Sequence, residues 1–413
     1  PCHPHPSALG PVDVHDIARR EDLARFVSDP VRIATDDGLV GYGDGTLNGR
    51  ELAVASYVAD HVAPTLVGAD ASRINDIWQY CYRGAYWRRG PVTMSAISAI
   101  DQALWDLNAK ALGVPVHRLL GGRARDFITA YPHCTGHTVE AALTDAAARL
   151  AEGYRALRVQ AQVPGVPTAY GVARGDEEYE PASSVLPDVE EWDTGAYLDF
   201  LPELIRATRD ELGYGFELLH DGHHRLNPSQ AGWMGRRLEP YRMFWLEDPT
   251  PEEDQRAFAT VRSLTSCPIA VGEVWNSVHD CQHAITERLI DYIRIPVTHG
   301  GGLTHLRQIL ALADVYGVRS GLQGASDISP IGQAANFALD WTIPNFGMQE
   351  YMGYPEDTWR VFTPHYRLEG GVITLDGTPG LGVEFDEEAA ARYPYEPRSL
   401  PVNRLRDGGM YDW

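Results

Sequence analysis

The chain has 413 residues, of which 44% are hydrophobic and 22% charged, a composition typical of a globular protein with more than one domain. Its formal net charge of −22 disfavours nucleic acids and anionic membrane surfaces as partners. No run of 18 apolar residues occurs and the first ten residues hold no apolar segment, so we expect neither a membrane-spanning helix nor a signal peptide.

The first elements along the chain predict a small α+β domain. Residues 31–35 and 39–43 are β-prone and flank an Asp-Asp-Gly turn, which is typical of a hairpin. Apolar residues recur at three- and four-residue steps over residues 94–111, and a glycine and a proline follow, which predicts an amphipathic helix. The first thirty residues show no pattern that we can assign to an element or a role.

From about residue 126, short apolar runs alternate with helical stretches. This alternation predicts parallel strands, and eight such units predict an α/β fold with a closed (β/α)₈ barrel. We therefore expect an α+β domain over residues 1–125, a barrel over residues 126–363 and a tail, residues 364–413, that packs back on the first domain. The strands are expected near residues 127–132, 156–160, 216–221, 244–248, 269–273, 292–297, 318–323 and 345–350.

One connection and two residue types add constraints. Residues 161–195 are rich in Pro, Gly, Asp and Glu without periodicity, and a loop of this length predicts a lid over the barrel mouth. The five cysteines are widely spaced without a CxxC motif, which predicts a cytoplasmic protein without disulfides or a zinc–thiolate site. The single lysine, Lys110, falls outside the predicted barrel, so Schiff-base and pyridoxal-phosphate chemistry are disfavoured.

Three acidic residues end three consecutive predicted strands. Asp221, Glu247 and Glu273 are separated by two equal intervals of 26 residues, one βα unit each. In a parallel barrel the strand C-termini open on one face, so the three carboxylates would converge there and repel one another without a cation. Oxygen ligands of this kind favour Mg²⁺. The alternative is that each acid is a helix N-cap or a solvated loop residue.

The residues around Asp221 include three histidines. His223 has the strand parity of Asp221, so its side chain can point into the site as an acid or base near neutral pH. A surface or capping role is the alternative for His223. It is the favoured interpretation of His220 and His224.

A second acid–base candidate is the pair of Arg158 and Tyr170. Arg158 ends the second predicted strand, and Tyr170 lies in the long loop that follows. A guanidinium group next to a phenol favours the phenolate and lowers its pKa, so the pair could remove a proton without any lysine. The alternative is that Tyr170 only packs in the loop.

Seven longer strings extend this picture: Thr46–Arg50, Arg83–Met94, Leu157–Gln160, His220–Arg225, Trp245–Pro251, Ala270–Asn276 and Pro344–Met352. Together with the three acids they resemble the D-mannonate dehydratases of the enolase superfamily, over a stretch from about residue 31 to Trp413. The resemblance implies that the N-terminal region and the tail form a capping domain on the barrel. It also implies one Mg²⁺ per subunit, an acid-sugar substrate and a homo-oligomer.

The resemblance also implies roles for individual residues. Arg158 and Tyr170 are similar to the base pair of that subgroup and His223 to its general acid. The implied reaction removes the C2 proton of a sugar acid and eliminates water, which gives a 2-keto-3-deoxy acid. The residues similar to its substrate contacts are Asn48, His133, Arg294, Gln323 and Glu350, and Trp413 is implied to close the pocket.

Gln323 departs from the subgroup, which has a histidine at the end of the seventh strand. A neutral amide can donate a hydrogen bond but cannot carry a proton. We therefore expect D-mannonate dehydration to be weak or absent. Two alternatives stay open: a dehydratase or epimerase for another acid sugar, and a metal- and ligand-binding relative with a regulatory role and little turnover.

Overall fold

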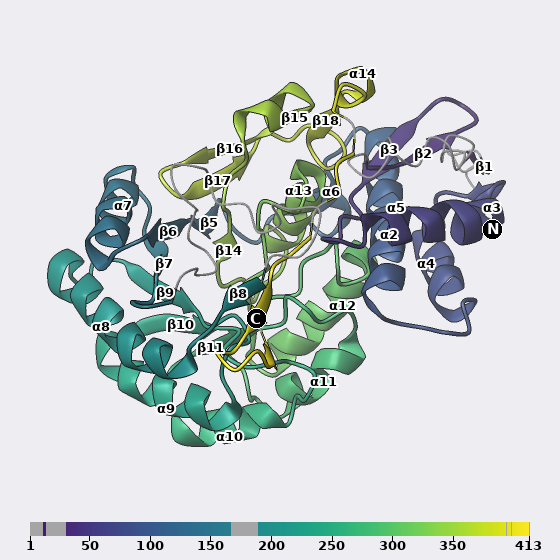
Figure 1. Cartoon of the computed structure of the whole chain (residues 1–413). Helices are drawn as coiled ribbons and strands as arrows, with labels where there is room; N and C mark the ends of the chain where they lie inside the picture. The colour runs from purple at the N-terminus through teal and green to yellow at the C-terminus, as the bar shows by residue number, and fades with distance from the viewer. Residues whose placement is uncertain (1–10, 14–29, 167–188, 394, 398, 413) are drawn as a thin grey trace.

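The computed structural model describes residues 11–13, 30–166, 189–393, 395–397 and 399–412, and it consists of a barrel flanked by a smaller domain (Figure 1). The N-terminal elements lie together at one side of the barrel, and the tail runs back over it. In these ranges no helix is both long and apolar enough to cross a membrane.

The barrel closes through eight parallel strand positions. The first is split at Pro132 into β5 (Ile128–Tyr131) and β6 (His133–Gly136). A parallel sheet runs from β6 to β13, and β14 (Gln349–Glu350) pairs with β5. The Ser320–Phe346 bridge joins the seventh and eighth positions. The predicted (β/α)₈ barrel is therefore confirmed, with most strands shorter than expected. The remaining strands are β7 (Ala156–Ala161), β9 (Glu217–Asp221), β10 (Met243–Glu247), β11 (Ile269–Val271), β12 (Tyr292–Ile293) and β13 (Arg319–Ser320).

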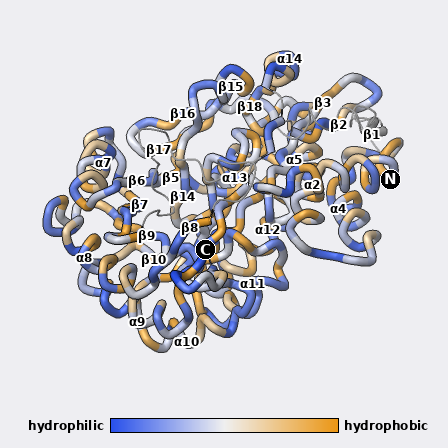
Figure 2. Tube along the Cα trace, in the orientation of Figure 1, coloured by the Kyte–Doolittle hydropathy of each residue, from blue (hydrophilic) through white to orange (hydrophobic). Residues whose placement is uncertain are grey.

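Helices surround the strands and expose a polar face to solvent. Figure 2 shows hydrophobic and hydrophilic residues alternating along the ring, as expected for helices that bury one face. Side-chain caps fix several helix starts, for example Asn227, which forms a capping box with Gln230. The eighth strand is followed by the short helix η3 (Glu356–Arg360). The ring consists of α7 (Val139–Ala151), α8 (Thr194–Leu212), α9 (Pro228–Leu238) with η2 (Glu239–Tyr241), α10 (Ala257–Leu264), α11 (Val278–Thr286), α12 (Gly302–Val315) and α13 (Pro330–Asp340).

The N-terminal domain is built on the predicted hairpin and helix. Strands β2 (Val31–Thr35) and β3 (Val40–Gly43) pair antiparallel, as predicted. Within the first thirty residues, β1 (Pro11–Asp13) pairs with β2 and with β4 (Ala69–Asp70). The helices are α2 (Glu51–Tyr57), the π-helix η1 (Val58–Val62), α3 (Ala63–Leu66), α4 (Ile74–Arg83), α5 (Pro91–Ala111) and α6 (Val116–Leu119).

Helix α5 ties this domain to the barrel. Its residues from Met94 to Ala109 are all buried, because β3 covers one face and barrel segments cover the other. Gly43 allows the close approach of β3, since a Cβ there would lie 1.9 Å from the Ala99 carbonyl oxygen. On the barrel side, Ser98 donates a hydrogen bond of 2.6 Å to the Val297 carbonyl oxygen.

The tail contacts both parts of the molecule. It contains β15 (Phe362–Pro364), β16 (Tyr366–Glu369), β17 (Val372–Leu375), β18 (Val383–Phe385), α14 (Glu387–Ala390), β19 (Val402–Arg404) and β20 (Met410–Tyr411). Glu387 accepts a hydrogen bond of 2.6 Å from the Tyr42 hydroxyl in the N-terminal domain. In contrast, β17 pairs with β5, and β19 pairs with β8 (Val189–Glu191), which precedes α8. Only part of the tail therefore packs on the first domain.

Candidate active site at the barrel mouth

The three predicted metal ligands lie where the barrel strands end. Asp221 and Glu247 are the last residues of β9 and β10 and are direct partners in the strand register. Glu273 follows β11, after Gly272, whose φ of 129° favours glycine. Asp221 and Glu247 are 1% and 0% exposed, so neither is the solvated loop residue of the alternative interpretation.

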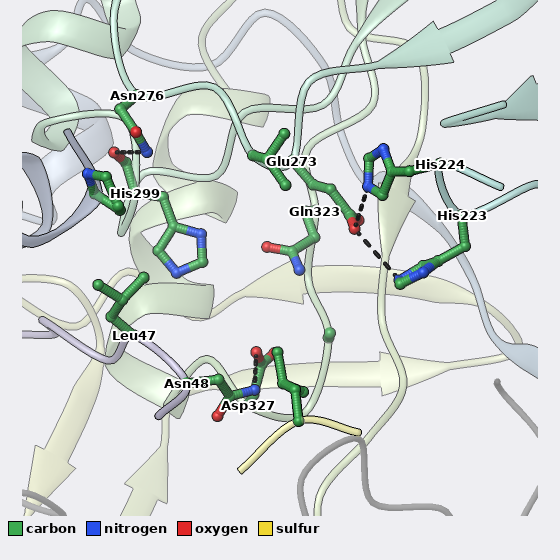
Figure 3. Close-up of a pocket in the computed structure, with 13 residues that line it drawn as sticks. Leu47, Asn48, His223, His224, Glu273, Asn276, His299, Gln323 and Asp327 are labelled. Atoms are coloured by element: carbon green, nitrogen blue, oxygen red, sulfur yellow. Dashed lines mark hydrogen bonds and ion pairs between the residues drawn. The ribbon is translucent and has the colours of Figure 1, made fainter. Parts of the chain in front are cut away.

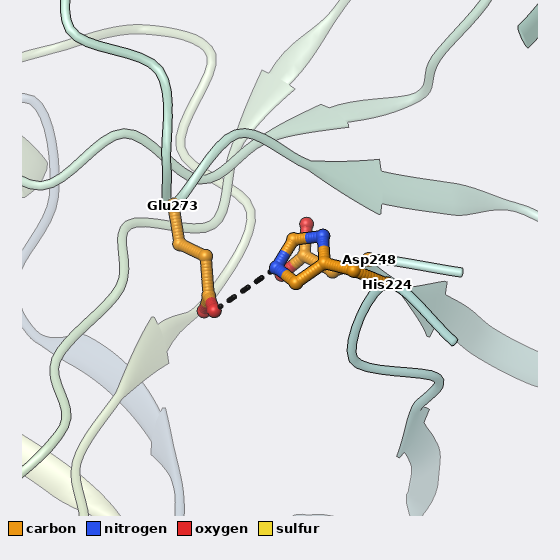
Figure 4. A group of neighbouring side chains, drawn as sticks. All are labelled: His224, Asp248 and Glu273. Atoms are coloured by element: carbon orange, nitrogen blue, oxygen red, sulfur yellow. Dashed lines mark hydrogen bonds and ion pairs between the residues drawn. The ribbon is translucent and has the colours of Figure 1, made fainter. Parts of the chain in front are cut away.

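Asp248, which the sequence interpretation missed, links these acids. Ligand atoms of Asp221, Glu247 and Asp248 all lie within 4.8 Å of one another, and the same holds for His224, Asp248 and Glu273 (Figure 4). Burial, opposed by Arg158 and reinforced by the neighbouring carboxylates, raises the pKa of Asp221 well above its usual range. The cluster therefore strongly favours positive charge close to Asp221.

Arg158 supplies part of that charge. Its Nη1 donates to Asp221 Oδ2 at 3.0 Å and to Glu247 Oε1 at 2.8 Å. Its Nη2 lies 2.8 Å from His133 Nδ1, and His133 Nε2 lies 2.6 Å from Glu350 Oε1. Arg158 thus lies in the middle of β7 and not at its end as predicted, and its hydrogen bonds go to the proposed metal ligands.

Arg294 is a second buried cation beside these carboxylates. Its Nη2 lies 3.1 Å from Glu247 Oε1, 3.2 Å from Glu273 Oε2 and 3.2 Å from Glu350 Oε2. Its Nε donates to Asp248 Oδ2 at 2.9 Å. Glu247 and Glu273, on neighbouring strands, therefore meet at a single guanidinium nitrogen, as expected if their carboxylates converge.

Two aromatic side chains, Tyr131 and Trp245, donate hydrogen bonds to the Glu247 carboxylate. The Tyr131 hydroxyl donates to Glu247 Oε2 at 3.1 Å and accepts from Arg294 Nη1 at 2.7 Å. Trp245 Nε1 donates to the same Glu247 oxygen at 2.7 Å. The i, i+2 spacing of Trp245 and Glu247 on one strand is the signal that could have revealed this contact. These donors fix the carboxylate in a place where an unpartnered charge would be costly.

The turn after β9 carries the histidines in a strained backbone. His223 and His224 have φ values of 47° and 62°, in the left-handed region that disfavours residues with a Cβ. The His223 N–H donates to Asp221 Oδ1 at 2.7 Å, and the His224 N–H donates to the Asp248 carbonyl oxygen at 2.6 Å. A turn, and not the parity of an extended strand, therefore directs the side chain of His223.

Both rings approach Glu273. His223 Nε2 lies 3.6 Å and His224 Nε2 lies 3.4 Å from Glu273 Oε1. Burial lowers the pKa of His223 well below its usual range, although Glu273 opposes this. Burial also acts to lower the pKa of His224, but the hydrogen bond with Glu273 and the charge of Asp248 outweigh it and raise that pKa to about 9.

The surface or capping interpretation of His220 and His224 is wrong. Both are buried, at 4% and 8% exposure. His220 lies 2.8 Å from the Val159 carbonyl oxygen and 3.0 Å from the Tyr197 hydroxyl, so it joins β9 to β7 and α8. His224 belongs to the site. Sequence spacing could not distinguish His224 from a surface residue, because the strained turn sets the orientations of His223 and His224.

A cavity of about 300 Å³ lies beside Glu273 and the two histidine rings (Figure 3). Asn48 of the N-terminal domain lies on its wall next to Asp327 and donates to Asp327 Oδ2 at 2.7 Å. Gln323 points into the cavity, and its Oε1 is buried without a hydrogen-bond partner among the described residues. The cavity is lined by Leu47, Asn48, Pro91, His223, His224, Glu273, Val274, Asn276, His299, Gln323, Ala325, Asp327 and Leu400.

The other predicted site residues have different positions. His133, Arg294 and Glu350 are not among the residues that line the cavity. With Arg158, Asp221 and Glu247 they form a connected set of hydrogen bonds and ion pairs, here called the charged layer. Tyr170 and Trp413 fall outside the described residues, as does most of the predicted lid. The lining residues Asn276, His299 and Asp327 were missed. His299 donates from Nε2 to the Thr46 carbonyl oxygen at 3.2 Å, and so joins the N-terminal domain to the mouth.

The residues present fit a hard divalent cation. Carboxylate oxygens from Asp221, Glu247 and Asp248 lie close together, and Glu273 is joined to them through Asp248 and Arg294. Oxygen donors without thiolates are the ligands that Mg²⁺ prefers. The acidic cluster could therefore hold a metal ion at the end of the cavity.

Comparison with known proteins decides the family. The model for "Enolase C-terminal domain-like" proteins matches residues 141–389, and the model for the mandelate racemase/muconate lactonizing enzyme N-terminal domain matches residues 17–121. The chain belongs to the enolase superfamily. Within it, the resemblance to the D-mannonate dehydratase subgroup is confirmed by proteins of that name with about half of their residues identical.

Three relatives are informative. A D-mannonate dehydratase from Rhizorhabdus wittichii is 53% identical over 93% of this chain and 95% of its own length. A D-galactonate dehydratase family member from Chromohalobacter salexigens is 51% identical, with the same coverage. A solved enolase from Pantoea ananatis, with bound D-gluconate and Mg, is 36% identical with a TM-score of 0.85 and covers 92% of this chain and 95% of its own.

Proposed function

We propose that the chain is a Mg²⁺-dependent acid-sugar dehydratase, a hydro-lyase. It removes the C2 proton of a sugar acid and eliminates the 3-hydroxyl as water, which leaves a 2-keto-3-deoxy acid. The observation that carries this proposal is the buried carboxylate cluster beside a polar cavity, in a chain 53% identical to a protein named D-mannonate dehydratase. A solved relative that contains both Mg and a sugar acid supports the metal and the substrate class.

Asp221, Glu247 and Glu273 are the proposed ligands of one Mg²⁺ per subunit. When bound, the cation supplies the charge that stabilises the enediolate formed after the C2 proton leaves. The buried guanidinium groups of Arg158 and Arg294 lie within 3.2 Å of these carboxylates, so they keep the layer from becoming strongly anionic before a substrate carboxylate enters.

The proton transfers are assigned to Arg158, Tyr170 and His223. Arg158 and Tyr170 are the proposed base pair. Tyr170 lies outside the described residues, so Tyr170→Phe, which removes only the ionisable oxygen, tests this half of the assignment by its loss of turnover. His223 is the proposed acid that protonates the leaving hydroxide. Its position on the cavity wall supports this role, whereas the burial that lowers its pKa opposes it.

Substrate contacts are proposed for Asn48, His133, Arg294, Gln323 and Glu350, and Trp413 is proposed to close the pocket. Asn48 and Gln323 line the cavity directly. The other three described residues form the charged layer, in which His133 and Glu350 are 2.6 Å apart. We also propose that the chain is a cytoplasmic homo-oligomer without a nucleic-acid or membrane partner.

Gln323 favours a changed substrate preference. It replaces the subgroup's histidine, and its amide oxygen in the cavity lacks a described partner. Losing a positioned acid–base or charge-stabilising group typically costs about 10²–10⁴-fold in rate, so D-mannonate dehydration is expected to be weak. A dehydratase or epimerase for another acid sugar is the second candidate, and a regulatory ligand-binding protein is the third.

The experiment is a screen of acid sugars for 2-keto-3-deoxy products, combined with kcat/KM for D-mannonate in the native chain and in Gln323→His. The expected result is weak native activity on D-mannonate and a gain with Gln323→His. Strong native activity on D-mannonate would refute the role given to Gln323. An absence of products from every acid sugar, with Mg²⁺ bound, would refute the dehydratase and favour the regulatory protein.

A further inference from the structure

Asp44, a buried acid of the N-terminal domain, connects two of the loops that line the cavity. It follows β3 and begins the segment 44–50, which carries the cavity residues Leu47 and Asn48 and leads into α2. Its exposure is only 3%, and it forms no salt bridge with any residue that the structure describes. A buried carboxylate without a cationic partner needs hydrogen-bond donors, and those donors show what it connects.

Each oxygen of the Asp44 carboxylate serves a different loop. Oδ1 accepts hydrogen bonds from the Thr46 N–H at 2.8 Å and from the Thr46 hydroxyl at 2.6 Å, within the segment that carries Asn48. Oδ2 accepts from the Ser329 N–H at 2.8 Å, in the loop between β13 and α13 that carries Asp327. The carboxylate therefore fixes these two loops relative to each other.

The position of Asp44 is itself enforced by its neighbours. Gln102 on α5, which is fully buried, donates from Nε2 to the Asp44 carbonyl oxygen at 2.9 Å and accepts from the Asp44 N–H at 3.2 Å. Ser329 is the N-cap of α13, so Oδ2 lies where the helix dipole favours a carboxylate. Gly332 leaves the room for it, since a Cβ there would lie 2.5 Å from Asp44 Oδ2.

The side chains carried by the two loops meet on the cavity wall. Asn48 Nδ2 donates to Asp327 Oδ2 at 2.7 Å across the junction of the two domains (Figure 3). Asp44 is not among the residues that line the cavity, so it can act on a ligand only through these loops. A binding group that is fixed before the ligand enters loses less entropy on binding.

We propose that Asp44 is a positioning residue for substrate binding, which sets the place of Asn48 on the cavity wall. This inference rests on the proposed function, because it takes Asn48 to contact the acid sugar. Asn48 is neither a proposed metal ligand nor a member of the proposed acid–base set. Its contact is therefore made equally in the ground state and the transition state, and its loss raises KM while kcat is retained.

The first measurement needs no ligand. Hydrogen exchange is followed by mass spectrometry on peptides that cover residues 44–50 and 325–331, in the native chain and in Asp44→Asn. The amide keeps the size of the side chain but turns one acceptor oxygen into a donor. Exchange is expected to be at least about tenfold faster in both segments, because backbone N–H groups lose a charged acceptor.

The matched control is Asp106→Asn, a second buried acid of the N-terminal domain. Asp106 is 2% exposed and accepts hydrogen bonds from the Tyr42 N–H at 3.0 Å and the Leu381 N–H at 2.8 Å. It joins β3 to the tail and lines no part of the cavity. Asp106→Asn should change exchange in the two segments, and KM, less than about twofold.

The second measurement is KM and kcat on D-mannonate and on the acid sugar that gives the most product in the screen. Asp44→Asn is expected to raise KM at least about tenfold and to change kcat less than about threefold. If Asp44 acts through Asn48, the double variant with Asn48→Ala should match the KM of Asn48→Ala alone to within about threefold. Effects on KM that multiply instead would show a purely structural role and overturn the proposal.

Circular dichroism establishes that each variant is folded. If Asp44→Asn does not fold, Thr46→Val removes one hydrogen bond to the carboxylate with little change in shape, and at least about threefold faster exchange of residues 44–50 and a higher KM are expected. Native-like exchange in both segments, or a lower kcat at unchanged KM, would overturn the proposal.

The two proposals fail separately. If no acid sugar is turned over, the dehydratase is refuted, and the dissociation constant of D-gluconate in the presence of Mg²⁺, measured by calorimetry, takes the place of KM. A positioning role for Asp44 is then supported by weaker D-gluconate binding in Asp44→Asn together with faster exchange. It is overturned if the native chain does not bind D-gluconate or if the variant binds it as tightly as the native chain does.

Discussion

Two successive layers inside the barrel differ in chemistry although both are buried. The lower layer is apolar and contains Tyr131, Ala156, Leu219, Trp245, Ala270, Tyr292 and Met348. Six of these residues are followed, two positions later in the chain, by a residue of the charged layer. That layer contains His133, Arg158, Asp221, Glu247, Arg294 and Glu350. Alternation along each strand turns both sets inward.

The two layers are equally buried but differ in the interactions of their side chains. Leu219 and Glu247 are both 0% exposed, so burial alone does not select an apolar residue. The charged layer exists because guanidinium groups pair with its carboxylates and because Tyr131 and Trp245 donate upward to Glu247. Its members depend on one another, since removal of one partner leaves another charge buried without compensation. Apart from these two hydrogen bonds, the packing of the lower layer depends on shape and volume.

The largest effect is expected for Glu247→Gln. The amide keeps the size of the side chain, but it removes one anionic ligand and brings a donor toward Arg158 Nη1, which now lies 2.8 Å from a carboxylate oxygen. We expect stoichiometric Mg²⁺ binding, measured by isothermal titration calorimetry, to be lost, and turnover with it. The far-ultraviolet circular dichroism spectrum should be unchanged. Native-like Mg²⁺ affinity in this variant would show that Glu247 is not a ligand.

A matched pair of variants separates the two histidines that share Glu273. His223→Asn should lower kcat/KM by about 10²–10⁴-fold with Mg²⁺ binding retained, as expected for the loss of a general acid. His224→Asn removes the ring whose pKa is raised to about 9, and it should weaken metal binding more than the chemical step. If His224→Asn loses the larger factor at saturating Mg²⁺, the acid role belongs to His224.

A substitution in the lower layer should affect stability and leave the chemistry in place. Leu219 is fully buried two residues before Asp221. Leu219→Ala leaves a cavity, and we expect the free energy of unfolding to fall by about 2–5 kcal/mol, measured by urea denaturation. Mg²⁺ affinity and kcat/KM per folded molecule should change less than about tenfold. A loss of metal binding as large as that of Glu247→Gln would show that the two layers are not independent.

Residues at the ends of the barrel strands could be predicted from the sequence, whereas residues in the turns that follow them could not. Asp221 and Glu247 could be placed because each ends an apolar strand, and a parallel barrel turns strand ends toward one mouth. Asp248 and His224 could not, because positive φ values of 35° and 62° orient them, and average backbone preferences disfavour such angles. The pairing of β19 with β8 joins segments far apart in the chain, and no local pattern specifies it.

Asp101 is a buried acid outside the charged layer, and it offers a contrast with Asp221. It is 3% exposed on α5, accepts a hydrogen bond of 2.9 Å from the Thr304 N–H, and forms no salt bridge within the described ranges. Burial, only partly opposed by the hydrogen bonds with Thr304, raises its pKa from the usual value to about 7. Arg307 acts on its carboxylate only through its charge, without a salt bridge like the one that Arg158 makes with Asp221.

This shift makes folding stability depend on pH in a defined direction. The unfolded pKa is about 3.9, so between about pH 4 and pH 7 the folded state binds more protons than the unfolded state. The stabilising contribution of protonated Asp101 is complete below about pH 4 and is lost as the pH rises through about 7. Each pKa unit corresponds to about 1.4 kcal/mol, which gives an upper limit of about 4 kcal/mol.

Asp101→Asn should remove this dependence. The amide keeps an acceptor for Thr304 but adds a buried donor, which costs about 1–3 kcal/mol if it finds no partner. We therefore expect a net gain of about 1–3 kcal/mol at about pH 8 and no gain at about pH 4, measured by urea denaturation at both values. Subtracting native from variant at each pH cancels the other titrating groups, which the two chains share. A variant that is equally destabilised at both pH values would show that Asp101 is not an uncompensated charge, and that contact with an arginine is not what distinguishes the charged layer.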